Sequence, residues 1–253
     1  MFKFDDKYQV IGKGKQALVL SDGTFAYKVF NDNYPKEWIQ YEYDLQKKIN
    51  RTNLPVIKYW DILDTNCIKM DLVQGKTLGD LLFDKKLKHS VEILIKLQKE
   101  IHSNHGLNLP SFKKITKEEL AKVKIDKDYI NLAYYLFELI EDGSTLLHLD
   151  LHFLNIMMNH DQITVIDWVN AKEGNPIFDY ARSYIIMNEY VFRLGQKYLR
   201  MIKKDCSINT EWLDEAIFIM ALLRLNEEQN PRTLKLINTL YKLLKEKHIN
   251  QND

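Results

Sequence analysis

The feature that most limits the fold of this chain is a change of pattern near Val73–Gly75. Before it, short apolar runs alternate with polar turn residues, which is typical of strands. After Gly75, apolar residues recur at helical spacing. Strands followed by helices predict an α+β fold and argue against alternating βα units. We therefore predict a small N-terminal lobe, residues 1–73, a larger helical lobe, residues 74–253, and a hinge near residues 71–75.

The same patterns predict the individual elements. Asp22-Gly23 is predicted as a two-residue hairpin turn, and Pro35 begins a helix to about Asn50. The apolar stripe of that helix is expected to contain Trp38, Leu45 and Ile49, and Thr77-x-x-Asp80 is typical of a capping box. Strands are predicted at residues 8–11, 17–21, 24–30, 56–61 and 67–71. Later helices are predicted at residues 91–103, 117–124, 128–141, 177–203, 210–228 and 231–247.

The composition indicates the compartment and the classes of partner, but not the chemistry of the protein. The net charge is +1, with 45% hydrophobic and 28% charged residues, so nothing favours nucleic acid or an anionic membrane as a partner. Cys67 and Cys206 form no disulfide framework or metal motif. The longest apolar run, residues 216–223, is too short to span a bilayer. The N-terminus carries aspartates where a signal peptide would be apolar. We expect a cytoplasmic monomer or weak dimer that binds neither nucleic acid nor membrane.

Residues 148–168, HLDLHFLNIMMNHDQITVIDW, predict a hairpin with polar residues at its ends. If the turn is centred near His160 and Asp161, the numbers of two residues that face each other across the hairpin add up to about 322. This places Asn155 opposite Asp167. Together with Asp150, these side chains would offer oxygen ligands for a hard cation such as Mg²⁺. The alternative is a strand pair that merely has polar ends.

A second group of residues lies in IGKGKQALVLSDGTFAYKVF, residues 11–30. Gly12 and Gly14 could let the backbone close over a phosphate and present N–H groups, although a plain tight turn would look the same. Lys28 interrupts an otherwise apolar strand, and Glu42 falls on the apolar stripe of the next helix. Each would supply the partner that the other needs. The alternative is a lysine that extends to solvent and a frayed helix.

Around the Asp22-Gly23 turn, facing positions are expected to sum to about 45. This register places Val19 opposite Ala26 and Ala17 opposite Lys28. Ala26 and Lys28 then share one face of their strand, next to the glycine loop.

With these motifs in order, the chain resembles the kinase-like superfamily, closest to the aminoglycoside phosphotransferase and choline kinase branch. The resemblance extends from residue 8 to about residue 185 and implies a two-lobed protein-kinase-like fold. Ala17 replaces the third loop glycine, and Leu149 stands where the family usually has glycine or arginine. The matching motifs are GxGxxAxV at residues 12–19, AYK at 26–28, Glu42, MDLVQG at 70–75, HxDxxxxN at 148–155, IDW at 166–168 and GNPIFDYAR at 174–182.

The resemblance implies a role for each motif residue in transferring a phosphoryl group from ATP, with GTP left open, to a small hydroxyl-bearing acceptor. Lys28, oriented by Glu42, would hold the α- and β-phosphates, and Asn155 and Asp167 would bind Mg²⁺. Asp150 would orient the attacking hydroxyl and take its proton late. His148 would brace this loop, His152 would lie near phosphate, and Asp179 would tie the loop from the next helix. The implied nucleotide-binding residues are Gly12, Gly14, Val19, Ala26, Lys28, Glu42, Met70, Asp71, Val73 and Met157, with Val19 and Ala26 above the adenine, Met157 below it and backbone groups of Asp71 and Val73 at its edge.

Three alternatives stay open. A protein kinase is disfavoured because Asp179 follows Asp167 by only twelve positions, which leaves no room for an activation loop. A nucleotide-binding pseudokinase is disfavoured because all five residues that would carry charge or bind the metal are present. These residues are Lys28, Glu42, Asp150, Asn155 and Asp167. A choline or ethanolamine kinase is less favoured because Val169, and not an acidic residue, follows IDW.

The acceptor is expected to be recognised by residues after Asp179. Several carboxylates there, together with Trp212, could favour a cationic acceptor such as an aminoglycoside. The alternative is that these acids simply form solvated helix faces. The acidic residues concerned are Glu211, Asp214, Glu215, Glu227 and Glu228.

Overall fold

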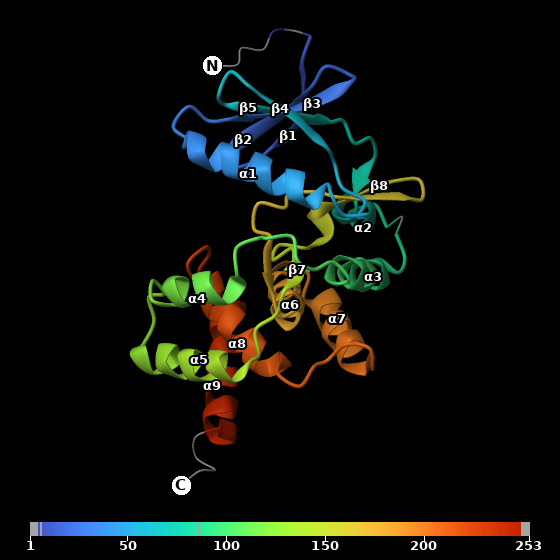
Figure 1. The fold of residues 1–253 in the computed structure, drawn as a ribbon. Coiled ribbons are helices and arrows are strands. Elements are labelled where there is room, and N and C mark those ends of the chain that lie inside the picture. The colour runs from blue at the N-terminus through green and yellow to red at the C-terminus, as the bar shows by residue number, and fades with distance from the viewer. Residues whose placement is uncertain (1–4, 6, 86, 249–253) are drawn as a thin grey trace. The chain divides into compact units, whose positions relative to one another are not determined.

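The structure is a computed structural model that describes residues 5, 7–85 and 87–248. The described chain forms two compact units, which Figure 1 draws with their helices and strands. The first unit contains residues up to Lys88 together with Phe153–Asn170, and the second contains His89–His152 and the residues from Ala171 onward. The first compact unit thus extends past residue 73 and also contains Phe153–Asn170, while a hinge near residues 71–75 stays a prediction. The later segment belongs to the first unit because Met157 and Met158 pair with Lys76–Thr77, and Val165 forms a bridge to Val56.

The first unit is built on an antiparallel five-stranded sheet in the order β1-β2-β3-β5-β4. Its strands are β1 (Gln9–Lys13), β2 (Ala17–Ser21), β3 (Phe25–Phe30), β4 (Tyr59–Leu63) and β5 (Cys67–Asp71). The predicted strands at 17–21 and 67–71 agree with β2 and β5 residue for residue. The loop between β2 and β3 is longer than predicted, because the Asp22 carboxylate accepts the N–H groups of Thr24 and Phe25 and holds three residues outside the ladder.

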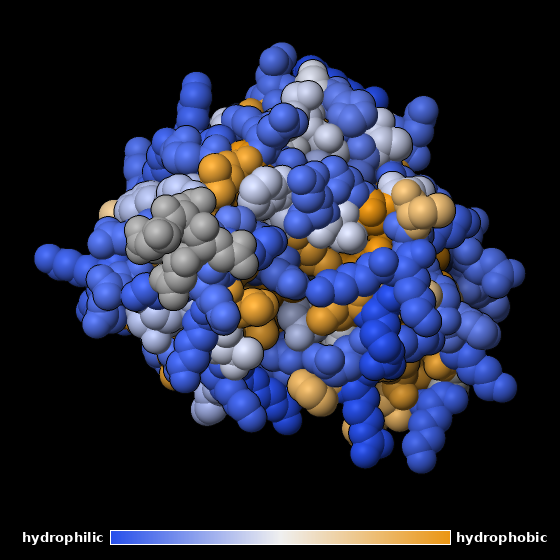
Figure 2. All heavy atoms as spheres, turned by 90° about the horizontal axis from the view of Figure 1, so that it is seen from below, coloured by the Kyte–Doolittle hydropathy of each residue, from blue (hydrophilic) through white to orange (hydrophobic). Residues whose placement is uncertain are grey.

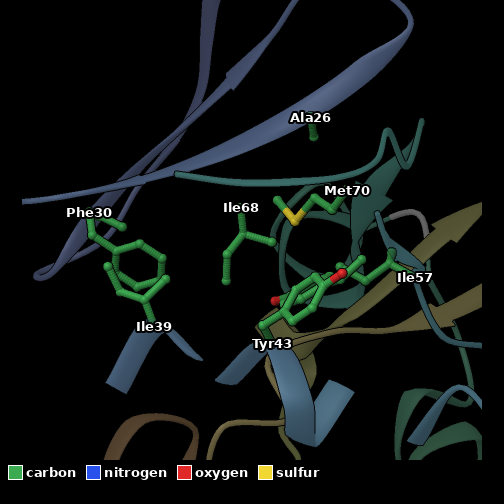
Figure 3. Packing of buried hydrophobic residues seen from close by; sticks show 9 residues of the cluster. Ala26, Phe30, Ile39, Tyr43, Ile57, Ile68 and Met70 are labelled. Atoms are coloured by element: carbon green, nitrogen blue, oxygen red, sulfur yellow. The ribbon is translucent and has the colours of Figure 1, made fainter. Parts of the chain in front are cut away.

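Helix α1 (Lys36–Ile49) packs on one face of this sheet, directly after Pro35. Figure 3 shows Ile68 and Met70 extending from the sheet toward Tyr43, and the ring of Phe30 against Ile39. The predicted stripe is right for Leu45 and Ile49 and wrong for Trp38, which is 53% exposed while Ile39 is buried. At the start of the helix, Ile39 and not Trp38 faces the sheet. Ile39 lies three positions before Glu42, so the two side chains share the helix face that meets the sheet.

A second sheet of the first unit has the order β6-β8-β9, with β6 (Lys76–Thr77), β8 (Ile156–Asn159) and β9 (Gln162–Val165). The capping box is confirmed: the Thr77 hydroxyl and the Asp80 carboxylate close the N-terminus of α2 (Leu78–Phe83). Gly75 adopts φ +115°, and a Cβ there would lie 2.2 Å from the Met158 carbonyl oxygen. Only glycine allows this approach of the two segments.

The second unit is mainly helical. Its helices are α3 (Ser90–His102), α4 (Phe112–Leu120), α5 (Lys127–Leu139), α6 (Ile177–Tyr190), α7 (Phe192–Lys204), α8 (Leu213–Arg224) and α9 (Pro231–His248). A short ladder joins β7 (Thr145–Leu147) to β10 (Lys172–Gly174). Helices α6 and α8 pack against each other and are buried along most of their length. The helix predicted over 177–203 is two helices, because Val191 leaves the helical region at φ −135° and ψ 56°.

The α+β class that we predict is confirmed by this arrangement. On the face drawn in Figure 2, hydrophilic residues cover most of the surface and hydrophobic residues appear in small separate areas. Across residues 5, 7–85 and 87–248, no helix combines the length and hydrophobicity that crossing a membrane requires.

Candidate active site

Lys28 is the centre of a charged cluster in the first unit. Its Nζ lies 2.7 Å from Oε1 of Glu42 and 3.9 Å from Oδ1 of Asp167. The predicted contact between the strand lysine and the helix glutamate is therefore confirmed. Burial alone would lower the pKa of Lys28, but Glu42 and Asp167 offset that effect and raise the pKa above its usual value. The lysine is a fixed cation with 20% of its side chain exposed.

The β2–β3 register that carries Lys28 differs from the prediction. Val19 faces Lys28 and Ser21 faces Ala26, so facing positions sum to 47. The pairs predicted for Val19 with Ala26 and for Ala17 with Lys28 are wrong, because the loop is longer than two residues. The partner of each β2 residue is displaced by two positions along β3. Because side chains of a strand alternate with a period of two, Ala26 and Lys28 still share one face.

Glu42 has a second partner that the sequence did not reveal. The Tyr59 hydroxyl donates to the same Oε1 at 2.8 Å, so one carboxylate oxygen accepts from both the lysine and the phenol. Tyr59 is the first residue of β4 and is 5% exposed. An aromatic residue in an edge strand is ordinary, so its sequence position carried no sign of this contact.

Four of the ten residues that we assign to the nucleotide belong to one apolar cluster or pack against it. Ala26 and Met70 are buried members of it, and Val19 and Val73 pack against it as partly buried residues. Met157 lies on β8 and is not a member of this cluster. The Asp71 N–H donates to the Lys58 carbonyl at 3.0 Å, so only its carbonyl oxygen could serve a ligand.

The glycine loop has less freedom than expected. Gly12 is paired with Val19 at the end of β1, and the Gly14 N–H donates to the Ala17 carbonyl at 2.9 Å. Positive φ values occur at Gly23, Gly75 and Gly106 but at neither of these two glycines. The hairpin itself therefore uses the Gly14 N–H, and the phosphate-binding role of Gly12 and Gly14 stays a prediction.

The β8–β9 hairpin also has a different register. Ile156 faces Val165 and Asn159 faces Gln162, so facing positions sum to 321. Asn155 consequently stands next to Ile166, whose N–H donates to the Asn155 carbonyl at 3.0 Å, and the direct pairing with Asp167 is wrong. Asn155 lies in the short helix η1 (Phe153–Asn155) and is buried, whereas 43% of the Asp167 side chain is exposed.

Asn155 and Asp167 belong to the same unit and offer an amide and a carboxylate oxygen. Such hard ligands fit Mg²⁺, which takes few protein ligands and fills its remaining positions with water and phosphate oxygens. Among the described residues, no group of three or more His, Cys, Asp or Glu side chains is arranged to hold a metal by itself. The donor set therefore fits a cation that a phosphate ligand helps to hold.

In the second unit, helix α6 holds the loop that carries Asp150. The Asp179 carboxylate accepts the N–H groups of His148 and Leu149, at 3.3 and 2.7 Å. Arg182 Nε donates to the Leu149 carbonyl at 3.2 Å, and the Ser183 hydroxyl donates to the Leu151 carbonyl at 2.8 Å. Positions 179, 182 and 183 share one face of the helix because they are three and four residues apart.

This helix face stabilises an unusual backbone. Leu149 adopts φ +60°, a conformation that costs free energy for a residue with a branched side chain. Its N–H and carbonyl are bonded to Asp179 and Arg182, respectively, which offsets that cost. His148 is fully buried, and its Nδ1 accepts the Asp150 N–H at 3.2 Å. The expected roles of His148 and Asp179 in bracing the loop agree with these contacts.

Asp179 has a further partner in α3. His102 Nε2 lies 2.9 Å from its Oδ2, and the two side chains are 8% and 0% exposed. Burial alone would raise the pKa of Asp179, but the hydrogen bond and charge of His102, with His148 and the Leu149 N–H, hold that pKa below its usual value. Asp179 is thus a buried, ionised carboxylate, and His102 is a positioning residue that the sequence did not reveal.

The Asp150 carboxylate lies between two basic side chains of the second unit. Arg182 Nη2 is 3.9 Å from Oδ1, and His152 Nε2 is 3.8 Å from Oδ2. Arg182 binds Glu227 more tightly, with Nη2 2.6 Å from Oε2. Arg182 belongs to the GNPIFDYAR motif, but no role was expected for it. Its signal was the spacing of three from Asp179 on one helix.

Four of the five acidic residues predicted to bind a cationic acceptor, Asp214, Glu215, Glu227 and Glu228, are paired with cations of the chain itself. Glu215 is buried and contacts Lys247 and His248, each at 2.7 Å. Glu227 contacts Arg182 and Arg224, which hold its pKa below the usual value against the effect of burial. Glu228 contacts Arg224 and the Tyr190 hydroxyl, and Asp214 contacts Lys203. Trp212 stacks on His248, with ring centroids 6.0 Å apart. These cations offset the charge that was expected to attract an acceptor.

Comparisons with known proteins agree with this arrangement. The family model described as Phosphotransferase enzyme family matches residues 5–215. A search of curated protein sequences finds no significant match. Among solved structures, a thermostable mutant of aminoglycoside phosphotransferase APH(4)-Ia in its apo form has a TM-score of 0.69 at 13% identity, covering 96% of this chain and 95% of that chain.

Two solved complexes are similar as well. The ternary complex of a thermostable APH(4)-Ia mutant with AMP-PNP and hygromycin B has a TM-score of 0.69 at 13% identity and covers 96% of this chain and 94% of that one. The streptomycin-ATP-APH(2")-IIa complex has a TM-score of 0.60 at 13% identity and covers 96% and 97%. At such identities the likeness concerns the fold, which is that of the protein-kinase-like superfamily.

Proposed function

The chain belongs to the phosphotransferase enzyme family, and we propose that it transfers the γ-phosphate of ATP to a hydroxyl of a small molecule with the help of Mg²⁺. One observation carries this proposal: Lys28 is held as a cation by Glu42 at 2.7 Å and by Asp167 at 3.9 Å, within an otherwise apolar strand. A lysine placed in this way meets the need of phosphoryl transfer, in which the protein mainly positions and neutralises phosphate oxygens.

The nucleotide side of the reaction is assigned to the first unit. Lys28 binds the α- and β-phosphates, and Glu42 keeps its ammonium group in place. Asp167 and the side-chain oxygen of Asn155 would hold Mg²⁺, which would supply positive charge to offset the charge of the phosphates. Val19, Ala26 and Met70 offer an apolar surface for the base, and GTP remains an alternative donor.

The acceptor side is assigned to Asp150. Its carboxylate accepts a hydrogen bond from the attacking hydroxyl and takes the proton as the new oxygen–phosphorus bond forms, while the bond from the γ-phosphorus to the bridging oxygen breaks and ADP leaves. An ordinary aspartate, with a pKa of about 3.9, is too weak a base to remove that proton in advance. Orientation is therefore its main contribution. The bonds from Asp179 and Arg182 to the Leu149 backbone support this role because they fix the loop that carries Asp150.

The acceptor is proposed to be a small hydroxyl compound, and aminoglycosides are the first class to test. Two of the similar solved structures contain hygromycin B and streptomycin, respectively, which motivates this choice. As part of the same proposal, the protein is cytoplasmic and works as a monomer or weak dimer. The two cysteines, one buried and one exposed, are both free thiols, which suits a reducing compartment.

The test has two stages. Binding of ATP and GTP is measured by calorimetry with and without Mg²⁺, and ATP consumption is then screened against aminoglycosides, choline, ethanolamine, sugars and other hydroxyl compounds. The proposal expects Mg²⁺-dependent binding and a product that carries a phosphate ester. Mg²⁺-dependent binding without turnover on any small molecule or protein would favour a pseudokinase, and phosphorylation of proteins alone would favour a protein kinase.

A further inference from the structure

We propose that Tyr59 is a positioning residue for phosphate binding, which acts through Glu42 to hold the Lys28 ammonium group away from Asp167. The inference rests on the proposed function, because it assigns a role within the same nucleotide site. It concerns only residues of the first unit.

The geometry that carries the inference is the sharing of one oxygen atom. Glu42 Oε1 accepts from Lys28 Nζ at 2.7 Å and from the Tyr59 hydroxyl at 2.8 Å. Glu42 and Tyr59 are 4% and 5% exposed, so water has little access to compete for this oxygen. Two donors from different strands, β3 and β4, therefore determine where the carboxylate points. Hydrogen bonds to an ionised acceptor are stronger than those between neutral groups.

The phenol can fill this role because it keeps its proton. Burial and the neighbouring Glu42 carboxylate raise the pKa of Tyr59 well above its usual value. A protonated phenol donates to the carboxylate and adds no charge that would compete with Lys28. Its hydroxyl thus fixes Glu42 while the charge of the lysine stays available for phosphate.

The packing of α1 separates this role from ordinary structural support. Three other side chains of the helix and its C-cap bond to β4 or to the segment before it. Tyr43 donates to the carbonyl of Trp60 in β4 at 3.0 Å, and Gln46 and Asn50 each donate to the Ile57 carbonyl at 2.9 Å. These contacts attach the helix to the sheet without involving Glu42. The Tyr59 hydroxyl, in contrast, bonds the Glu42 side chain directly.

The consequence of losing this hydroxyl follows from the second neighbour of Lys28. Without the bond from Tyr59, the Glu42 carboxylate can rotate, and Lys28 can move toward Asp167, which already lies 3.9 Å away. A lysine paired with Asp167 competes with Mg²⁺ for that carboxylate. Removal of the hydroxyl should therefore weaken nucleotide binding and also raise the Mg²⁺ concentration that binding requires.

The experiment compares Tyr59→Phe with Tyr43→Phe by calorimetry, with AMP-PNP as the probe over a series of Mg²⁺ concentrations. Both variants remove one hydroxyl from the interface of α1 and β4, but only Tyr59 bonds Glu42. We expect Tyr59→Phe to raise the Kd roughly tenfold, as loss of a hydrogen bond to a charged group implies, and to raise the half-saturating Mg²⁺ concentration. Tyr43→Phe should stay within about twofold of the wild type.

Two further measurements make the result decisive. In a Glu42→Gln background, Tyr59→Phe should add little to the Kd, because the two residues act as one unit. The calorimetric stoichiometry reports the folded fraction, so loss of folding lowers the number of sites and leaves the Kd unchanged. Equal Kd values in Tyr59→Phe and Tyr43→Phe, with normal binding by the wild type, would overturn this inference alone. Absence of nucleotide binding by the wild type would overturn the proposed function and this inference with it.

Discussion

Arg182 is tied to the loop around Asp150 in two ways. Its Nη2 lies 3.9 Å from Oδ1 of Asp150, and its Nε donates to the Leu149 carbonyl at 3.2 Å. Because 3.9 Å is longer than a hydrogen bond, the guanidinium acts on Asp150 by charge and by fixing the adjacent backbone. Glu227, at 2.6 Å, is its closest acidic partner and keeps the guanidinium in place.

Arg182→Lys should reduce turnover roughly tenfold or more, about 1.4 kcal/mol, with little change in nucleotide affinity. A lysine keeps the charge but lacks the two separate nitrogens, Nε and Nη2, with which Arg182 bonds the Leu149 carbonyl and Glu227. The matched control is Arg224→Lys, which alters the other arginine bound to Glu227. Steady-state kinetics and thermal unfolding of both variants check the prediction. If Arg182→Lys and Arg224→Lys lost the same turnover, Arg182 would only stabilise this network and would have no specific effect on Asp150.

Asp150→Asn should abolish phosphoryl transfer while nucleotide affinity in the presence of Mg²⁺ stays within about threefold, because the amide cannot take the proton of the acceptor hydroxyl. Single-turnover kinetics and calorimetry measure the two properties separately. If nucleotide binding collapsed together with transfer, Asp150 would have a structural or metal-binding role instead.

Asp167→Ala should weaken nucleotide binding and make the residual binding insensitive to Mg²⁺, because a metal-binding carboxylate is lost. Titration of the variant with AMP-PNP, with and without Mg²⁺, measures this. Asp84→Asn is a control from the same unit, since the Asp84 carboxylate contacts Lys76 and has no assigned role in nucleotide binding. An Mg²⁺ dependence equal to that of the wild type would remove Asp167 from the metal site.

Lys28→Ala and Glu42→Ala should each reduce turnover strongly, and the double variant should be little worse than Lys28→Ala alone. The proposed role of Glu42 is to orient the lysine, so removing it after the lysine is gone should matter little. A double-mutant cycle on kcat/KM for ATP provides the coupling. Additive losses would mean that Glu42 acts on the nucleotide independently of Lys28.

Asp179→Asn should lower the free energy of unfolding by about 1–3 kcal/mol at pH 7, because it weakens a buried hydrogen-bonded pair with His102. The pKa of Asp179 is lower in the folded protein than in the unfolded chain. Its contribution is therefore present above an unfolded pKa of about 3.9 and is lost as the pH falls through the lower folded value. Urea unfolding at pH 7 and at lower pH measures the decrease.

A surface pair between α3 and α7 supplies the control for this prediction. Glu92→Gln breaks the contact of Glu92 with Lys197, and both of these side chains are more than a third exposed. The change in unfolding free energy should be clearly smaller than for Asp179→Asn. If the two variants lost the same free energy at pH 7, or if the effect of Asp179→Asn grew as the pH fell, the assigned role of Asp179 would be wrong.

Local patterns in the sequence were sufficient for most elements and for one long-range contact. Strands 17–21 and 67–71, the capping box at Thr77 and the helix that follows Pro35 depend on neighbouring residues, whose side-chain chemistry directly favours those conformations. The Lys28–Glu42 contact was predictable because each charge interrupts an apolar pattern, and a buried charge needs a partner. The hairpin registers were less predictable, because one or two loop residues shift every pair of a ladder.

Only the tertiary structure decided which ordinary-looking residues serve these sites. Tyr59, His102 and Glu227 occupy positions where a tyrosine, a histidine and a glutamate are common. Their partners Glu42, Asp179 and Arg182 are 17, 77 and 45 residues away. For the acidic residues after Asp179, the sequence suggested a ligand site that the fold does not favour. In the structure Arg182, Arg224 and Lys247 lie beside these carboxylates and offset their charge. The sequence determines which charges and hydroxyls exist, but packing between distant segments decides which of them meet and which are already neutralised.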